Sequence, residues 1–148
     1  MMTAIRPIIA LGIAVSLAAC GGTSRSWWEG RWLGNRNLPL RPGENELAIK
    51  TIGRVDLTIQ GNGRFELFEG GVPKSGRVRF AGDKAYLKVE TFFWKPIEAQ
   101  GDAAVAMNKE IELSRIGERV RFFDPAGFDK EPIILVRQPK PDPASSRN

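Results

Sequence analysis

Hydrophobic and polar residues alternate with a period of two along most of the segment 27–138, which is typical of β-strands with one buried face. The segment 55–68 is the clearest case, because two alternating runs flank the turn Gly61-Asn62-Gly63. A three-residue loop fixes the register of such a hairpin. The predicted cross-strand pairs are Ile59 with Phe65, Leu57 with Leu67 and, on the opposite face, Thr58 with Glu66.

Further strands follow the same pattern. A second hairpin is predicted between 77–80 and 84–89, with Val78 facing Leu87, Phe80 facing Ala85, Arg79 facing Tyr86 and Arg77 facing Lys88. A third runs from about Met107 to Phe122 and turns at Gly117-Glu118. The segment 133–138 is predicted as a closing strand and 47–52 as an early one. Only the Ala-rich segment 98–106 lacks clear alternation, and we expect no helix.

The positions predicted to face inward are all apolar and mostly bulky. They are Val55, Leu57, Ile59, Phe65, Leu67, Val78, Phe80, Leu87, Val89, Ile111, Leu113, Val120, Phe122, Ile133 and Leu135. Such a set can fill the interior of a small barrel completely. The sequence therefore favours a packed core over a ligand cavity, although an apolar ligand such as a fatty acid would suit a purely apolar cavity.

The amino-acid composition excludes several classes of catalytic and metal-binding site. The chain has 148 residues and a net charge of +5, with no histidine and one cysteine. The absence of histidine excludes imidazole bases, Ser-His and Cys-His nucleophile pairs and histidine metal ligands, and a single cysteine excludes an internal disulfide. We expect no catalytic residue, no metal and no cofactor.

The N-terminus has the features of an export signal. One basic residue, Arg6, precedes an apolar run of 12 residues over 8–19, which is too short for a permanent membrane span. The following Leu17-Ala18-Ala19-Cys20 resembles the bacterial lipobox, in which the cysteine carries acyl chains. We therefore expect a signal peptide over 1–19, and a lipidated Cys20 with a tether over 20–26. The Pro-rich segment 139–148 is predicted to be a disordered tail.

The lipobox resemblance also implies a location. In double-membrane bacteria, lipoproteins with a residue such as Gly21 after the cysteine, rather than aspartate, are sorted to the outer membrane. The resemblance therefore implies an exported protein held on the outer membrane by its acyl chains and facing the periplasm.

The domain itself opens with Gly30-Arg31-Trp32, which resembles the Gly-x-Trp opening of lipocalin-type barrels. That resemblance, together with the successive hairpins, implies an all-β fold: an antiparallel up-and-down meander forming a small lipocalin-like barrel of about eight strands over 27–138. It further implies that Trp32 closes one end of the barrel. Further motifs of true lipocalins are not found, so the resemblance concerns the fold alone.

Two outer surfaces are candidate contact sites. Arg77, Arg79, Lys84 and Lys88 form a basic stripe on the second hairpin. It is either a solvated strand face or a contact with lipid headgroups or an acidic envelope polymer.

The second surface is aromatic. Alternation from Val89 places Phe93 inside and Phe92 and Trp94 outside. These two exposed rings either contact a partner or are covered by a neighbouring loop.

Together these features predict a membrane-anchored envelope lipoprotein that acts as a non-catalytic binding or structural module. The alternative is a carrier that holds a small hydrophobic ligand inside the barrel. The expected partners of the lipoprotein are the membrane, through the acyl chains on Cys20, and another envelope protein or an anionic surface. Nucleic acid is not expected in this compartment.

Overall fold

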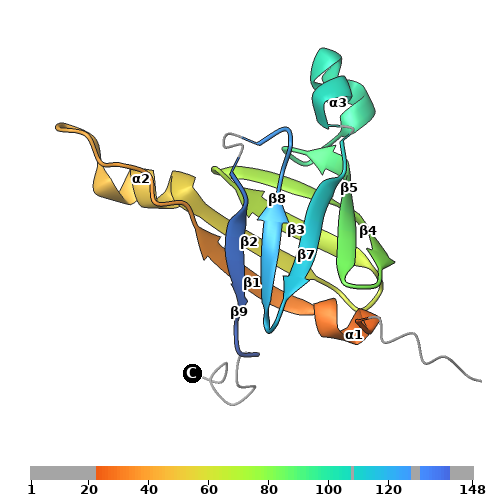
Figure 1. Cartoon of the computed structure of the whole chain (residues 1–148). Coiled ribbons are helices and arrows are strands. Elements are labelled where there is room, and N and C mark those ends of the chain that lie inside the picture. The colour runs from red at the N-terminus through yellow and green to blue at the C-terminus, as the bar shows by residue number, and fades with distance from the viewer. Residues whose placement is uncertain (1–22, 108, 128–130, 141–148) are drawn as a thin grey trace, which may run out of the picture.

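Eight antiparallel strands form a closed barrel in the computed structural model, which describes residues 23–107, 109–127 and 131–140 (Figure 1). The strands are β1 (Gly30–Asn35), β2 (Arg54–Ile59), β3 (Arg64–Glu69), β4 (Val72–Ala81), β5 (Lys84–Phe92), β7 (Ile111–Ile116), β8 (Arg119–Phe123) and β9 (Ile133–Arg137). Closure comes from β9, which pairs with both β8 and β1. The short strand β6 (Lys95–Pro96) pairs with β5 outside the barrel. The predicted all-β, lipocalin-like barrel is thus confirmed as a fold.

The predicted registers are confirmed as well. In β2 and β3, Leu57 lies opposite Leu67. In β4 and β5, Val78 lies opposite Leu87 and Arg77 opposite Lys88. Residues 117–118 form the predicted turn between β7 and β8. Strand β7 begins at Ile111 rather than near Met107 as predicted. Alternation fixes these registers because a slip by one residue would move every apolar side chain to the solvent face.

The prediction that no helix would form was wrong. The segment predicted as a strand over 47–52 is helix α2 (Glu46–Gly53), because the side chain of Asn45 accepts hydrogen bonds from the backbone N–H groups of Leu47 and Ala48. Helices α1 (Arg25–Trp28) and α3 (Asp102–Met107) and the 3-10 helix η1 (Ile97–Gln100) are also present. Within the described residues, no helix has the length and apolar character needed to span a membrane.

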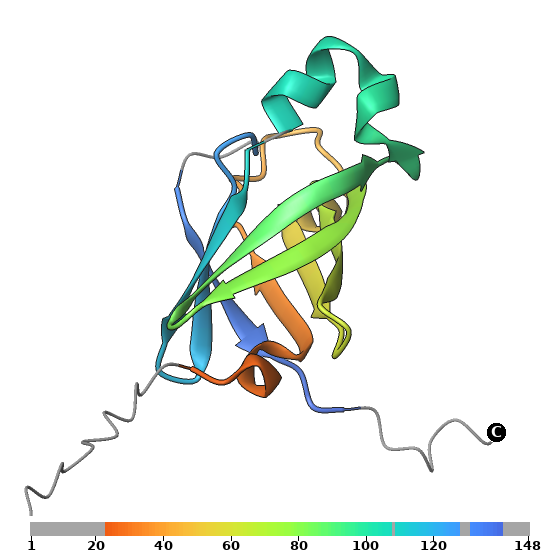
Figure 2. The same ribbon diagram turned by 90° about the vertical axis from the view of Figure 1, so that its right-hand side faces the viewer.

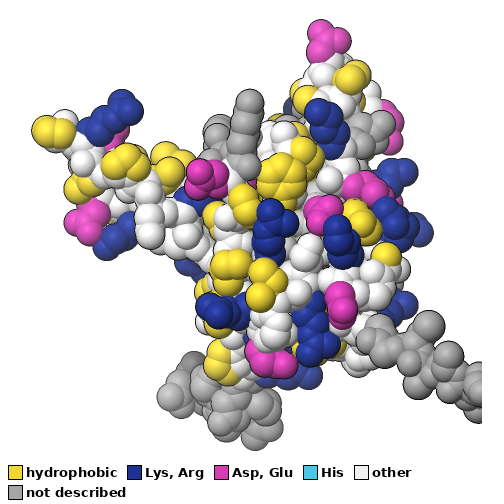
Figure 3. Space-filling view, in the orientation of Figure 1, with side chains coloured by type: hydrophobic (Ala, Val, Ile, Leu, Met, Phe, Trp, Pro, Cys, Tyr) yellow, Lys and Arg dark blue, Asp and Glu magenta, His cyan; other side chains and the backbone are white. Residues whose placement is uncertain are grey.

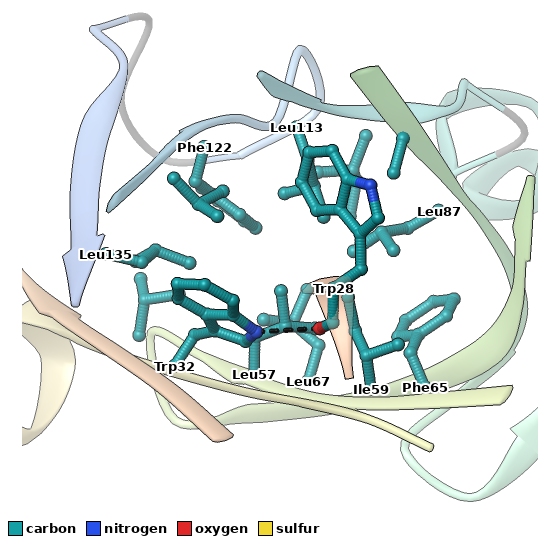
Figure 4. Packing of buried hydrophobic residues seen from close by; sticks show 14 of the residues in the cluster. Trp28, Trp32, Leu57, Ile59, Phe65, Leu67, Leu87, Leu113, Phe122 and Leu135 are labelled. Carbon is teal, nitrogen blue, oxygen red and sulfur yellow. Dashed lines mark hydrogen bonds between the residues drawn. The ribbon is translucent and has the colours of Figure 1, made fainter. Parts of the chain in front are cut away.

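The core is built around two tryptophans. Trp28 and Trp32 are both fully buried, and the indole Nε1–H of Trp32 donates to the carbonyl oxygen of Trp28 at 2.9 Å (Figure 4). The predicted inward residues surround them: all are buried except Val78, Phe80 and Ile133, which are half-buried and pack against the cluster. Trp32 therefore lies buried on β1, and Trp28 packs in the interior beside it.

The two ends of the barrel differ. At one end, here called the plug end, α1 lies beneath the barrel, and both described chain ends emerge there (Figure 2). Helix α1 includes Arg25 and Ser26, which were predicted as tether, and Arg115 donates to Thr23 at 3.1 Å. The opposite end, here called the far end, carries the β3–β4 turn, the β5–β6 turn and α3 (Figure 2).

Candidate functional site

A β-bulge reverses the alternation of β5 near the far end. Val89 lies opposite Gly76, but the next pair is Thr91 with Ser75, so β5 contains one extra residue, Glu90. Gly76 is required at this bend, because a Cβ atom there would lie 2.0 Å from the Lys88 carbonyl oxygen.

The bulge corrects the prediction for the aromatic residues. Phe92 lies opposite the buried Lys74 and is half-buried on the inner side of the rim. Phe93, predicted inside with Val89, is instead 46% exposed. Of the two rings predicted outside, Trp94 alone is strongly exposed, at 80%.

Phe93 and Trp94 form the two-residue turn between β5 and β6, and we call them the aromatic turn. Both have left-handed backbone angles, with φ of 49° and 59°. Such turns strongly favour Asn-Gly, since positive φ strains bulky residues. The turn is tied to β4 by a hydrogen bond from the N–H of Phe93 to the Pro73 carbonyl oxygen at 3.0 Å.

Trp94 lies at the edge of a hollow on the outer surface of β1 to β5, which we call the outer groove. Its volume is about 600 Å³, within the range of ligand-binding sites. The residues that line it are Arg31, Asp56, Thr58, Glu66, Leu67, Phe68, Pro73, Lys74, Ser75, Thr91 and Trp94. The outer groove therefore combines aromatic rings with hydroxyl and carboxylate groups.

The polar side chains of the outer groove are partly paired. Arg31 donates to both oxygens of Asp56, at 2.9 and 2.6 Å, and this hydrogen bonding lowers the pKa of that carboxyl. The hydroxyls of Ser75 and Thr91 lie 2.6 Å apart. Glu66 is exposed, and its carboxylate accepts from the Gln60 amide at 3.4 Å. The outer groove thus offers several hydrogen-bonding groups. One of them is the Glu66 carboxylate, which forms no ion pair with a lysine or arginine among the described residues.

Four charged side chains are buried beneath the outer groove at the far end, and we call them the ion cluster: Arg36, Glu69, Lys74 and Asp124. The Lys74 ammonium donates to Glu69 at 2.9 Å and to Asp124 at 2.5 Å. Arg36 also donates to Glu69. Two cations and two carboxylates leave the cluster neutral, as buried charges require.

Burial and pairing shift these groups in different directions. Burial raises the pKa of the Glu69 carboxyl. Burial opposes the charged form of Asp124 too, but hydrogen bonding with Glu69 and attraction to Lys74 outweigh it, so the pKa of Asp124 is lowered. Burial likewise opposes the charged form of Lys74, but attraction to Glu69 and Asp124 outweighs it, so the pKa of Lys74 is raised. The cluster fixes the end of the β3–β4 hairpin, whose outer face carries Phe68 and Pro73.

The ion cluster was not predicted from the sequence. A signal was present, because Glu69 continues the inward parity of Phe65 and Leu67, and Lys74 shares the parity of Val78 and Phe80. A charged residue at an inward position of a predicted strand needs a buried partner of opposite charge. Two such residues near the same end of the barrel therefore indicate that this end has a polar interior.

The basic stripe is confirmed as an outer surface but is not unpaired. Arg77 contacts Glu90 at 3.2 Å, Arg79 contacts Glu110 at 2.6 Å and Lys84 contacts Glu112 at 2.9 Å. Glu90 stands beside the facing pair of Arg77 and Lys88 that the register predicts. On the face shown in Figure 3, basic and acidic side chains are likewise interspersed.

Cys20, the predicted signal peptide and the end of the predicted tail lie outside the described residues. Among the described residues, no group of three or more potential ligands could hold a metal ion. Comparison with models of known protein families finds no match, and no curated protein matches the chain significantly.

Proposed function

We propose that this protein is an envelope lipoprotein, anchored in the outer membrane through Cys20 and facing the periplasm, whose barrel is a non-catalytic module that binds a partner on its outer surface. The anchoring part rests on the sequence Leu17-Ala18-Ala19-Cys20 and the short apolar run before it. The binding part rests on the barrel.

The observation that carries the proposal is the contrast between the inside and the outside of the barrel. Inside, Trp28 and Trp32 are fully buried among apolar side chains (Figure 4). Outside, the outer groove ends at Trp94, which is exposed on a strained turn. Exposed aromatic residues at a hollow are a frequent feature of binding surfaces, whereas two buried indole rings occupy interior space that an internal ligand would need.

The arrangement of the barrel supports this assignment. The described chain begins at the plug end, so a short tether to a lipid on Cys20 would hold that end nearest the membrane (Figure 1). The aromatic turn lies at the far end. In this orientation Trp94 lies at the end of the barrel farther from the anchoring membrane, and its partner is another envelope component rather than the lipid that holds the protein.

Membrane fractionation tests the anchoring part. The Trp94→Ala chain, which lacks the proposed envelope contact, should still incorporate labelled fatty acid and fractionate with membranes after a high-salt wash, whereas the chain with both Cys20→Ser and Trp94→Ala should do neither. Membrane-bound protein carrying both substitutions would contradict the anchoring role of the acyl chains.

Sedimentation with purified cell envelopes tests the binding part. The Cys20→Ser chain should sediment with envelopes. When Trp94→Ala is added to Cys20→Ser, the chain should remain in the supernatant. The matched control, with Val136→Ala added to Cys20→Ser, should sediment as Cys20→Ser alone does. Val136 is an exposed apolar residue on β9. Equal sedimentation of all three would contradict binding through the outer groove.

A further inference from the structure

The outer groove has a chemistry that points to a specific class of partner. Resting on the proposed function, we propose that it binds an uncharged oligosaccharide of flat pyranose rings, which stack on Trp94 and Phe68 and hydrogen-bond to the hydroxyl and carboxylate groups beside them.

Two parallel rows of side chains cross the strands of the outer groove. In the apolar row, Phe68 lies opposite Pro73, and the hydrogen bond from Phe93 to Pro73 brings the aromatic turn to the end of that row. The polar row runs one step away, with registered neighbours Thr58, Glu66, Ser75 and Thr91. A pyranose ring with equatorial substituents has apolar C–H faces and hydroxyl groups that project from its edge. Its faces therefore match the apolar row, and its hydroxyl groups match the polar row.

The charges of the groove favour an uncharged ligand. Arg31, the registered neighbour of Thr58, is paired with Asp56 at 2.6 Å, and none of Thr58, Glu66, Ser75 and Thr91 carries a positive charge. Glu66 is a carboxylate that can accept hydrogen bonds from sugar hydroxyls. An anionic polymer or a phosphate would meet this carboxylate beside an Arg31 guanidinium that is already paired with Asp56, so neutral sugars fit better.

Strand pairing argues against an extended peptide as the ligand. Each of β1 to β5 is hydrogen-bonded to a neighbouring strand on both sides, so the floor of the groove has no free strand edge. A peptide chain laid across it would bury backbone N–H and C=O groups without the ladder that strand addition supplies. The groups that the groove does offer are side-chain hydroxyls and a carboxylate.

The aromatic turn supplies an independent reason to expect selection for binding. Two bulky residues with positive φ destabilise a turn that Asn-Gly would form readily. The aromatic turn places Trp94 at the groove while leaving it 80% exposed. A stacking platform for a flat ligand accounts for both features.

Calorimetric titration of the Cys20→Ser chain tests this inference with three probes: cellohexaose, the hexamer of N-acetylglucosamine, and the anionic hexamer of galacturonate. At least one uncharged hexamer should bind, and galacturonate should bind more weakly. Trp94→Ala should weaken binding by about tenfold or more, and Trp94→Phe should restore part of it. Val136→Ala, whose side chain is on β9, should leave binding unchanged.

The outcomes separate the sugar assignment from the proposed function. Failure of both uncharged hexamers to bind, or undiminished binding by Trp94→Ala, overturns the sugar assignment. If envelope sedimentation still depends on Trp94 in that case, the proposed outer binding surface stands and its partner has another chemistry. If a hexamer binds through Trp94 but the chain neither sediments with envelopes nor carries a lipid, the sugar site stands and the proposed function fails.

Discussion

The guanidinium carbon of Arg137 lies 4.3 Å from the ring centroid of Trp32, at the seam where β9 closes the barrel against β1. Arg137 also donates to the backbone carbonyls of Glu29 and Trp27. One side chain therefore joins the last strand, the first strand and α1. A guanidinium suits this position because it stacks on an indole and presents several donors at once.

Removal of this side chain should open the seam. Arg137→Ala is expected to lower the free energy of unfolding by about 2–4 kcal/mol, from the lost stacking and the lost charged hydrogen bonds. Arg119→Ala, an exposed substitution on neighbouring β8, should change it by less than about 0.5 kcal/mol. Urea denaturation of both variants is the measurement, and equal losses would contradict the role of Arg137.

The two tryptophans at positions 32 and 94 should differ strongly in their effect on stability. Trp32→Ala removes a fully buried side chain and should cost about 3–5 kcal/mol. Trp94→Ala should stay within about 0.5 kcal/mol of wild type because the ring is exposed. Similar losses in a chemical melt would place Trp94 in the core and remove the basis for the outer groove.

The aromatic turn should exchange stability for binding. Replacement by Phe93→Asn with Trp94→Gly introduces the pair that positive φ favours and should raise the free energy of unfolding by about 1–3 kcal/mol. The same double variant should lose envelope binding. A destabilised double variant in thermal or urea unfolding would show that the aromatic side chains support the fold instead.

The ion cluster should make stability depend on pH through Asp124. Its lowered pKa contributes stability that is present above the unfolded value of about 4 and is lost as the pH falls through the lower folded value. The raised pKa of Glu69 acts in the opposite direction, with stability lost as the pH rises, so we compare proteins that share Glu69.

Urea denaturation between pH 7 and pH 3 measures this difference. Asp124→Asn should be less stable than wild type by about 1–3 kcal/mol near neutral pH, and the gap should narrow below pH 4. Asp102→Asn, at the start of α3, controls for the loss of an exposed carboxylate and should stay within about 0.5 kcal/mol. A gap for Asp124→Asn that widens in acid would contradict the assigned direction.

The barrel was predictable because alternation encodes both strand faces and hairpin registers. Leu57 opposite Leu67 and Val78 opposite Leu87 follow from the period of two and the turn lengths alone. Helix α2 was not predictable in this way, because the β-branched residues in 47–52 favour a strand. The deciding hydrogen bonds come from the side chain of Asn45, just outside that segment.

The candidate site was only partly predictable for a related reason. Exposure of Trp94 was predicted from alternation, but the bulge at Glu90 shifts the parity, and a bulge has no period to detect. The outer groove gathers side chains from several strands, so it requires the three-dimensional register. The ion cluster joins Lys74 to Asp124 across 50 positions, a contact that no local pattern contains.

The central claim is that the barrel binds on its outside and is filled on its inside, and nuclear magnetic resonance of the tryptophan indole N–H signals tests it most directly. The signals of the Cys20→Ser chain are first assigned with single Trp→Phe variants and then followed during titration with laurate or with solubilised envelope fragments. We predict that envelope fragments shift the Trp94 signal and that laurate leaves Trp28 and Trp32 unmoved. A laurate-induced shift of the Trp28 or Trp32 signal, with Trp94 unchanged by envelope fragments, would contradict the account and identify the protein as a carrier.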